Sequence, residues 1–207
     1  MTDLFKNKYR ISSARLQTWD YADNGLYFIT ICTANRERLF GDIVETQCIA
    51  SLPALRTSQM QLNDFGKIVE KEWLKTTEVR PDMNLELYEY VVMPNHFHAI
   101  IYIGENQYNT AARYYNYTRE EMPFVSANDS INVVKNKFGP QNKNLASIVR
   151  GFKSAVTTFA RKNNVPFNWQ TRFHDHIITT NDEYQRIADY IINNPAKWQE
   201  DKFYLTK

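Results

Sequence analysis

Cysteine is scarce in this chain of 207 residues, and long apolar runs are missing from it. The two cysteines, Cys32 and Cys48, form no CxxC pair, so a disulfide framework is not expected. No apolar run approaches the roughly 18 residues that a membrane-spanning helix requires. The first residues, MTDLFKNKYR, contain no apolar signal core. These absences predict a reduced, cytoplasmic protein without a membrane partner.

Acidic residues are missing from one long stretch, although the net charge of the chain is only +2. The residues between Ser130 and His174 include no Asp or Glu. The basic residues of that stretch are Lys135, Lys137, Lys143, Arg150, Lys153, Arg161, Lys162 and Arg172. A local excess of positive charge suits a polyanionic partner such as nucleic acid. A solvated face balanced by acids elsewhere in space is the other interpretation.

Apolar periodicity predicts a single domain of mixed strands and helices. Strands are expected at 25–33, 85–92 and 96–103, with an extended segment at 167–179. Helices are expected at about 62–77, with Asn63 as N-cap, at 145–162 and at 182–195. RERLFGDIV (36–44) suggests a second strand or an edge piece, and SLPALRTSQ (51–59) a loop. This order predicts an α+β sandwich, with helices packed on a central antiparallel sheet.

The apolar period is lost between about Gly104 and Asn144, in a segment rich in Asn, Tyr and Ser. We expect an insertion between two core elements there. Its tyrosines, which include Tyr108, are candidates for stacking on nucleic-acid bases. Packing on the protein surface is the preferred interpretation.

Histidine occurs four times, and two of the four stand together in VVMPNHFHAIIYI. Side chains alternate between the faces of a strand, so His96 and His98 project from one face and Phe97 from the other. Two imidazoles on an apolar strand must both find polar partners, and a divalent metal would satisfy them. Two half-exposed histidines at a strand edge are the alternative.

A catalytic metal site needs a third protein ligand and an open position for substrate. His174 and His176, in FHDHII, also alternate onto one face, and four histidines together would suit zinc. A zinc hydrolase is therefore one functional hypothesis. A side chain from a helix packed over the sheet is the other source of a third ligand.

The last predicted helix offers such side chains. Tyr190 lies beside its apolar face, and Asn194 follows one turn later along the same edge. An amide oxygen can ligate a hard cation, and a tyrosine hydroxyl can attack phosphorus. A core tyrosine and a helix-ending asparagine would show the same spacing.

Four segments resemble one family, in family order and along nearly the whole chain outside the insertion. MPNHFHAI resembles the His-hydrophobic-His motif of single-tyrosine transposases, the HUH enzymes. DYIINNPAKW resembles the tyrosine-bearing helix of their REP-associated branch. KYRISSARLQTWDY and NWQTRFHDHII resemble the segments that precede the first strand and the last helix in that branch.

The resemblance implies a ferredoxin-like core and one catalytic domain over residues 1–207, with an insertion at about 104–144. It implies a metal-dependent transposase that cleaves and rejoins single-stranded DNA beside hairpins, through a 5′-phosphotyrosine intermediate. His96 and His98 match the metal-binding pair, for Mg²⁺ or Mn²⁺, and Tyr190 matches the nucleophile. Asn194 stands where a third, amide-type ligand is expected, although many relatives carry Gln there.

The implied partner is single-stranded DNA with a hairpin, of REP-like or element-end sequence, bound by a monomer or a homodimer. We expect phosphate contacts from Arg150, Lys153 and Arg161, on the helix at 145–162. The N-terminal segment is a second candidate DNA-binding surface because it is basic; its residues are Lys6, Lys8, Arg10 and Arg15. A protein that binds DNA hairpins without catalysis is the remaining hypothesis.

Overall fold

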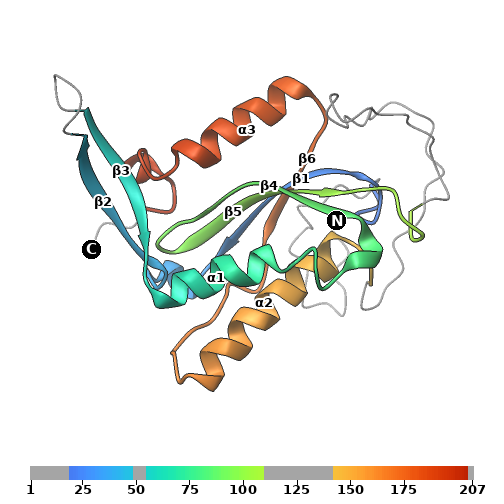
Figure 1. Cartoon of the computed structure of the whole chain (residues 1–207), viewed down its shortest axis with the longest axis horizontal. Coiled ribbons are helices and arrows are strands. Elements are labelled where there is room, and N and C mark those ends of the chain that lie inside the picture. Colours follow the sequence, from blue (N-terminus) through green and yellow to red (C-terminus); the bar gives the residue numbers. More distant parts are fainter. Residues whose placement is uncertain (1–18, 49–54, 110–141, 205–207) are drawn as a thin grey trace, which may run out of the picture.

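The computed structural model describes residues 19–48, 55–109 and 142–204. Four strands form an antiparallel sheet in the order β4-β5-β1-β6. Their bounds are Gly25–Cys32 for β1, Leu85–Val92 for β4, His96–Ile103 for β5 and His174–Ile178 for β6. Helices α1 and α2 lie on one face of this sheet, and α3 lies on the other (Figure 1). The predicted α+β sandwich is confirmed.

The helices span Asp64–Leu74 (α1), Leu145–Lys162 (α2) and Asn181–Asn193 (α3). Short 3₁₀ turns lie at Ala34–Arg36 (η1), Pro81–Met83 (η2) and Trp198–Glu200 (η3). The edge strands β4 and β6 follow α1 and α2, and the central strands are β5 and β1. This order of strands and crossovers is the ferredoxin-like arrangement that the motifs imply.

Capping side chains set where the helices begin. Asn63, Asn144 and Thr180 each accept a backbone hydrogen bond at the start of α1, α2 and α3. The Asn63 cap is the one that the sequence predicts. Helix α3 stops just before Pro195, which has no N–H group to continue the ladder.

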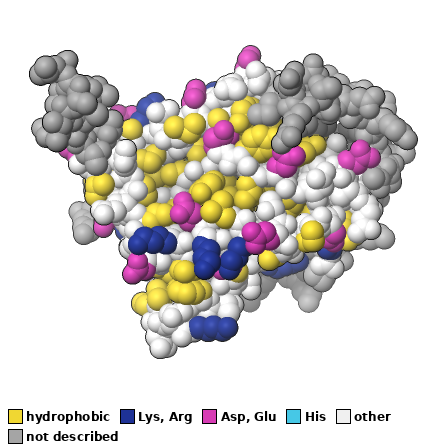
Figure 2. Space-filling model, viewed as in Figure 1, with side chains coloured by type: hydrophobic (Ala, Val, Ile, Leu, Met, Phe, Trp, Pro, Cys, Tyr) yellow, Lys and Arg dark blue, Asp and Glu magenta, His cyan; other side chains and the backbone are white. Residues whose placement is uncertain are grey.

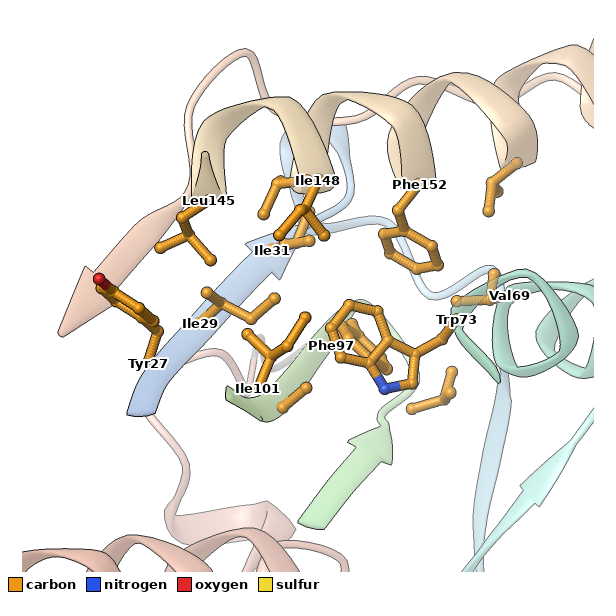
Figure 3. Packing of buried hydrophobic residues seen from close by; sticks show 14 of the residues in the cluster. Tyr27, Ile29, Ile31, Val69, Trp73, Phe97, Ile101, Leu145, Ile148 and Phe152 are labelled. Carbon is orange, nitrogen blue, oxygen red and sulfur yellow. The ribbon is translucent and has the colours of Figure 1, made fainter. Parts of the chain in front are cut away.

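The larger core lies between the sheet and the helices α1 and α2 (Figure 3). Phe97 of β5 packs against Trp73 of α1 and Phe152 of α2, with ring centroids 5.0 and 5.3 Å apart. A shift of β5 by one residue would turn Phe97 out of this core, so the packing fixes which face each β5 side chain takes. The other core residues labelled in Figure 3 are Tyr27, Ile29, Ile31, Val69, Ile101, Leu145 and Ile148.

Helix α3 packs on the opposite face over a smaller apolar cluster. The strands contribute Leu26, Ile100 and Ile178, and α3 contributes Tyr184, Ile187, Ala188 and Ile191. Further along the same face the buried side chains become polar, with Thr30, His96 and His98. The sheet face that α3 covers therefore carries an apolar core at one end and buried polar side chains at the other.

Strand β2 (Gly41–Cys48) pairs antiparallel with β3 (Leu55–Leu62) in a separate two-stranded ribbon. The strand predicted at 36–44 is right only from Gly41 onward. The loop predicted at 51–59 is wrong from Leu55 onward. Polar residues occupy most positions of LRTSQMQL, so the apolar period that marks a strand is absent, and pairing with β2 defines the strand instead.

The candidate DNA-binding residues Lys6, Lys8, Arg10 and Arg15, and residues 110–141 of the insertion, lie outside the described part of the chain. Tyr108 is described, and its hydroxyl donates a hydrogen bond to Asp82 Oδ2 at 2.6 Å. This contact agrees with surface packing for that tyrosine. Within the described ranges, no helix has the length and apolarity needed to cross a membrane.

Candidate catalytic and metal-binding site

The histidine pair lies buried on the α3 face of the sheet. His96 and His98 are 0% and 1% exposed, and their ring centroids lie 4.5 Å apart. Phe97 points into the opposite core, as strand alternation predicts. The alternative of half-exposed histidines at a strand edge is wrong, because β5 is flanked by β4 and β1.

Asn95 fixes the ring of His96. Its Nδ2 group donates to the carbonyl oxygens of Arg36 at 3.1 Å and Phe203 at 2.9 Å, which orients the amide. Asn95 Oδ1 therefore faces His96 Nδ1 at 2.8 Å and accepts a hydrogen bond from its N–H group. With that proton on Nδ1, His96 Nε2 carries a lone pair, which is the form of imidazole that ligates metals.

His98 is held between β1 and α3. Thr30 Oγ1 lies 2.8 Å from His98 Nδ1, and the Tyr190 hydroxyl lies 3.2 Å from Nε2. Thr30 is the direct cross-strand neighbour of His98, and Phe28 stacks on the imidazole with centroids 5.3 Å apart. The central strand β1 thus orients the second histidine.

The end of α3 brings two predicted side chains to one acceptor. The Tyr190 hydroxyl donates to Asp201 Oδ2 at 3.2 Å, and Asn194 Nδ2 donates to the same oxygen at 2.9 Å. Their spacing of four residues therefore places them together, as the sequence predicts. Tyr190 is 39% exposed and lines an open hollow, so a substrate can reach it.

Asp201 is the functional candidate that sequence reasoning missed. Its Oδ1 accepts a hydrogen bond from the Phe203 N–H at 2.7 Å, which holds the carboxylate in place after η3. One ligand atom from each of His96, His98 and Asp201 lies within 4.8 Å of the others. This group is compact enough for one divalent ion. In the sequence, QEDK resembles any charged surface turn, so no spacing pointed to it.

Two buried polar atoms at this place have no hydrogen-bond partner within the described residues, namely His96 Nε2 and Asn194 Oδ1. An unsatisfied buried acceptor costs about 1–3 kcal/mol, and a cation would satisfy both. Imidazole nitrogens with a carboxylate and an amide oxygen suit a divalent metal such as Mg²⁺, Mn²⁺ or Zn²⁺. The residues therefore fit an ion held by His96, His98 and Asp201, with Asn194 beside it.

Burial keeps both imidazoles neutral, which is their metal-binding form. It lowers the pKa of His96 to about 3, with a further decrease from the charge of Lys202, while the nearby Asn194 side chain acts the other way. Burial also lowers the pKa of His98 well below its ordinary value, and the neighbouring His96 adds to this effect.

The surroundings of Tyr190 favour its protonated hydroxyl. Burial raises the pKa of Tyr190, and the charge and hydrogen bond of Asp201 raise it further. The chain's own residues therefore hold Tyr190 as a phenol at neutral pH. These residues alone therefore do not favour the phenolate, which is the more reactive nucleophile.

His174 and His176 lie on the same sheet face, beyond β1. His98 and His174 both pair with Thr30, from opposite sides, which separates them by about 10 Å at normal strand spacing. His176 Nε2 instead lies 2.6 Å from Glu183 Oε1. Among the described residues, the candidate ligand group includes neither His174 nor His176, so the four histidines do not form one zinc site.

The predicted phosphate-binding residues of α2 lie away from the histidine pair, on the other side of the sheet (Figure 1). Arg150, Lys153 and Arg161 line an open hollow together with residues 168–171. The Lys153 ammonium donates to the Gln170 carbonyl, so this side chain ties α2 to that segment. The structure therefore brings Tyr190 and Asn194 together with His96 and His98, and it places the α2 residues on the other side of the sheet.

No protein-family model matches the chain. A protein of Haemophilus influenzae, described as uncharacterized, is 35% identical over 194 residues, which span 93% of this chain and 92% of the relative. The chain belongs to the same family as that protein.

Two solved structures are similar to the chain. One is the REP-associated tyrosine transposase bound to a REP hairpin, with 19% identity and a TM-score of 0.49, over 93% of this chain and 77% of that chain. The other is a candidate transposase from Deinococcus radiodurans, with 10% identity and a TM-score of 0.35, over 89% of this chain and 97% of that chain.

Proposed function

We propose that this chain is a single-tyrosine transposase of the HUH type, one catalytic domain that cleaves and rejoins single-stranded DNA beside hairpins. The observation that carries the proposal is the contact of an accessible tyrosine with a buried ligand group. The Tyr190 hydroxyl lies 3.2 Å from His98 Nε2 and 3.2 Å from Asp201 Oδ2. A nucleophile next to a group that can hold a divalent cation is what phosphoryl transfer by tyrosine requires.

The proposed ligands of Mg²⁺ or Mn²⁺ are His96, His98 and Asp201, with Asn194 Oδ1 as a further donor. When bound, the cation would offset the negative charge that develops on the scissile phosphate. Asn95 and Thr30 are positioning residues, because each holds one imidazole through its Nδ1 atom.

Tyr190 Oη forms a bond to phosphorus, and the bond from phosphorus to the 3′ oxygen breaks. The products are a 5′-phosphotyrosine ester and a free 3′-OH, so the proton lost by Tyr190 balances the proton gained by the leaving oxygen. Attack of a second 3′-OH on the ester rejoins the strand and restores Tyr190. The ester conserves the energy of the phosphodiester bond, so rejoining needs no nucleotide cofactor.

The test is a covalent adduct assay. The protein is mixed with labelled single-stranded DNA that carries a hairpin from the flank of its own gene, plus Mn²⁺, and resolved on a denaturing gel. Tyr190→Phe is compared with Tyr184→Phe as a matched control. Tyr184 lies on the same helix but is buried, and its hydroxyl donates to Glu89 at 2.8–2.9 Å.

We expect an adduct in the wild type and in Tyr184→Phe, and none in Tyr190→Phe. An adduct that persists in Tyr190→Phe would contradict the assignment of the nucleophile. Hairpin binding without an adduct in any of the proteins would favour the non-catalytic DNA-binding hypothesis. Tightly held zinc without an adduct would favour a hydrolase.

A further inference from the structure

A hollow of about 330 Å³ opens beside Tyr190, between α3 and the strands β1 and β6. Its walls carry the positive groups of Arg186 and Lys202 and the rings of Phe28 and His174. If Tyr190 attacks a phosphate, the attached nucleotide lies among cations and aromatic rings. The hollow is therefore where the substrate strand would begin.

This hollow continues away from Tyr190. It shares Thr30, His174 and Lys202 with a second hollow of about 340 Å³. The second shares Gln170 with a third hollow, of about 370 Å³, on α2. Residues 168–178 contribute to the wall of all three, so the hollows follow one another along this segment, and together they are here named the β6 groove.

The segment 168–178 is held firmly against β1. Trp169 forms a β-bridge with Thr33, and the Gln170 N–H donates to the Cys32 carbonyl at 2.9 Å. β6 then pairs with β1 along its whole length. Figure 1 shows this part of the chain passing from α2 toward α3 along the sheet edge. The β6 groove therefore leads from one face of the sheet round its edge to the other.

Positive charge lines the β6 groove throughout, and no Asp or Glu of the described residues lines it. Its basic residues are Arg36, Arg150, Lys153, Arg161, Arg172, Arg186 and Lys202. By contrast, the hollow between β2 and η3 is lined by Asp42, Glu45 and Glu200 beside its cations. The face in Figure 2 carries hydrophobic and acidic side chains between α3 and α1. The β6 groove is therefore better suited to a polyanion than these surfaces.

Two features favour a single strand over a duplex. A duplex has a persistence length of about 150 bp, so turning sharply round a sheet edge would cost it much bending energy. Aromatic side chains in a basic groove also stack unpaired bases. Besides Tyr190, the Phe and Trp residues that line the β6 groove are Phe28, Trp169, Phe173 and Phe203.

We propose that the β6 groove binds the single-stranded DNA that continues from the cleaved phosphate, with Tyr190 at one end and Arg161 of α2 at the other. The choice of DNA rests on the proposed function, whereas the path rests on the groove itself. Arg161 and Arg172 then bind phosphates remote from the reacting atoms.

The test measures binding of labelled oligo-dT of about 12 nucleotides, within the site sizes of single-strand grooves, by fluorescence anisotropy at several salt concentrations. The variant is Arg161→Gln with Arg172→Gln. The control is Lys67→Gln with Lys71→Gln, which removes the same charge from exposed positions on α1, outside the groove.

Each phosphate contact with a single strand contributes about 0.7 to the slope of log affinity against log salt. The groove variant should therefore lower that slope by about 1.4 and weaken binding about tenfold or more at about 0.1 M salt, while the control changes little.

An equal loss of oligo-dT affinity in both double variants, or no binding of oligo-dT by the wild type, would contradict the proposed path of the strand. A duplex competitor that displaces oligo-dT as well as a single strand does would overturn the preference for single strands. The adduct assay runs on the same proteins. If none of the proteins forms an adduct but the groove variant still loses oligo-dT affinity, the proposed cleavage reaction is wrong and the proposed binding path stands.

Discussion

Asn95→Ala tests whether the turn before β5 prepares His96 for a metal. Asn95 is fully buried, and its side chain makes three hydrogen bonds of 2.8–3.1 Å, to Arg36, Phe203 and His96. At about 1 kcal/mol of net stability for each bond, truncation should lower the free energy of unfolding by about 3 kcal/mol. For a chain of this size, that loss corresponds to a decrease in Tm of roughly 6–12 °C.

The same change should weaken Mn²⁺ binding by about 10- to 100-fold, the usual effect of removing the residue that orients a metal-binding histidine. Mn²⁺ affinity is measured by titration, and independently from the rise in Tm with added metal. Asn144→Ala is the control, since this buried asparagine caps α2 and its loss costs about 1 kcal/mol. Unchanged Mn²⁺ affinity in Asn95→Ala, or an equal decrease in Asn144→Ala, would refute the reasoning.

Three further changes test other parts of the structure. Thr30→Val removes the contact with His98 Nδ1, and we expect a loss of about 1 kcal/mol in urea unfolding and weaker Mn²⁺ binding; unaltered affinity would argue against a role for Thr30. Burial raises the pKa of Glu183, but hydrogen bonds from Thr179 and His176 outweigh it and the net shift is downward. A lowered pKa stabilises the fold above the unfolded value of about 4.3 and loses this effect as pH falls through the folded value. The difference in unfolding free energy between wild type and Glu183→Gln should therefore shrink below about pH 4, and a constant difference would contradict this. Gly66→Ala should lower Tm although Ala favours helices by about 1 kcal/mol, because a Cβ there would meet the Phe40 carbonyl. Gly151→Ala meets only the end of the Arg80 side chain and should cost less; equal effects would contradict the packing.

Sequence reasoning succeeded where one face of an element packs on a core. β4 and β5 have the predicted bounds, because alternate residues such as Phe97 must enter the core. The helical period likewise predicted that Tyr190 and Asn194 converge, and both reach Asp201. β3 was missed because its definition comes from pairing with β2 and not from an apolar pattern.

Asp201 was missed for a different reason. Its place depends on the chain reversing after α3, so that Trp198 and Phe203 pack over His96 with ring centroids 5.9 and 4.6 Å away. Such a reversal depends on tertiary contacts, and residue spacing along a helix or strand carries no information about them. The aromatic residues around Asp201 were the available signal, because they imply that this turn is buried against something.

The same reversal explains the charge of the site. Trp198 and Phe203 exclude water from His96, and this burial keeps the imidazoles neutral. Asp201 is then the one carboxylate in the ligand group. A divalent cation beside two neutral imidazoles and one carboxylate keeps one positive charge, which matches the single negative charge of a phosphodiester. A second carboxylate would cancel that charge. With a bound cation, a ligand group of this composition would favour a phosphodiester over a neutral substrate, in agreement with the proposed attack by Tyr190.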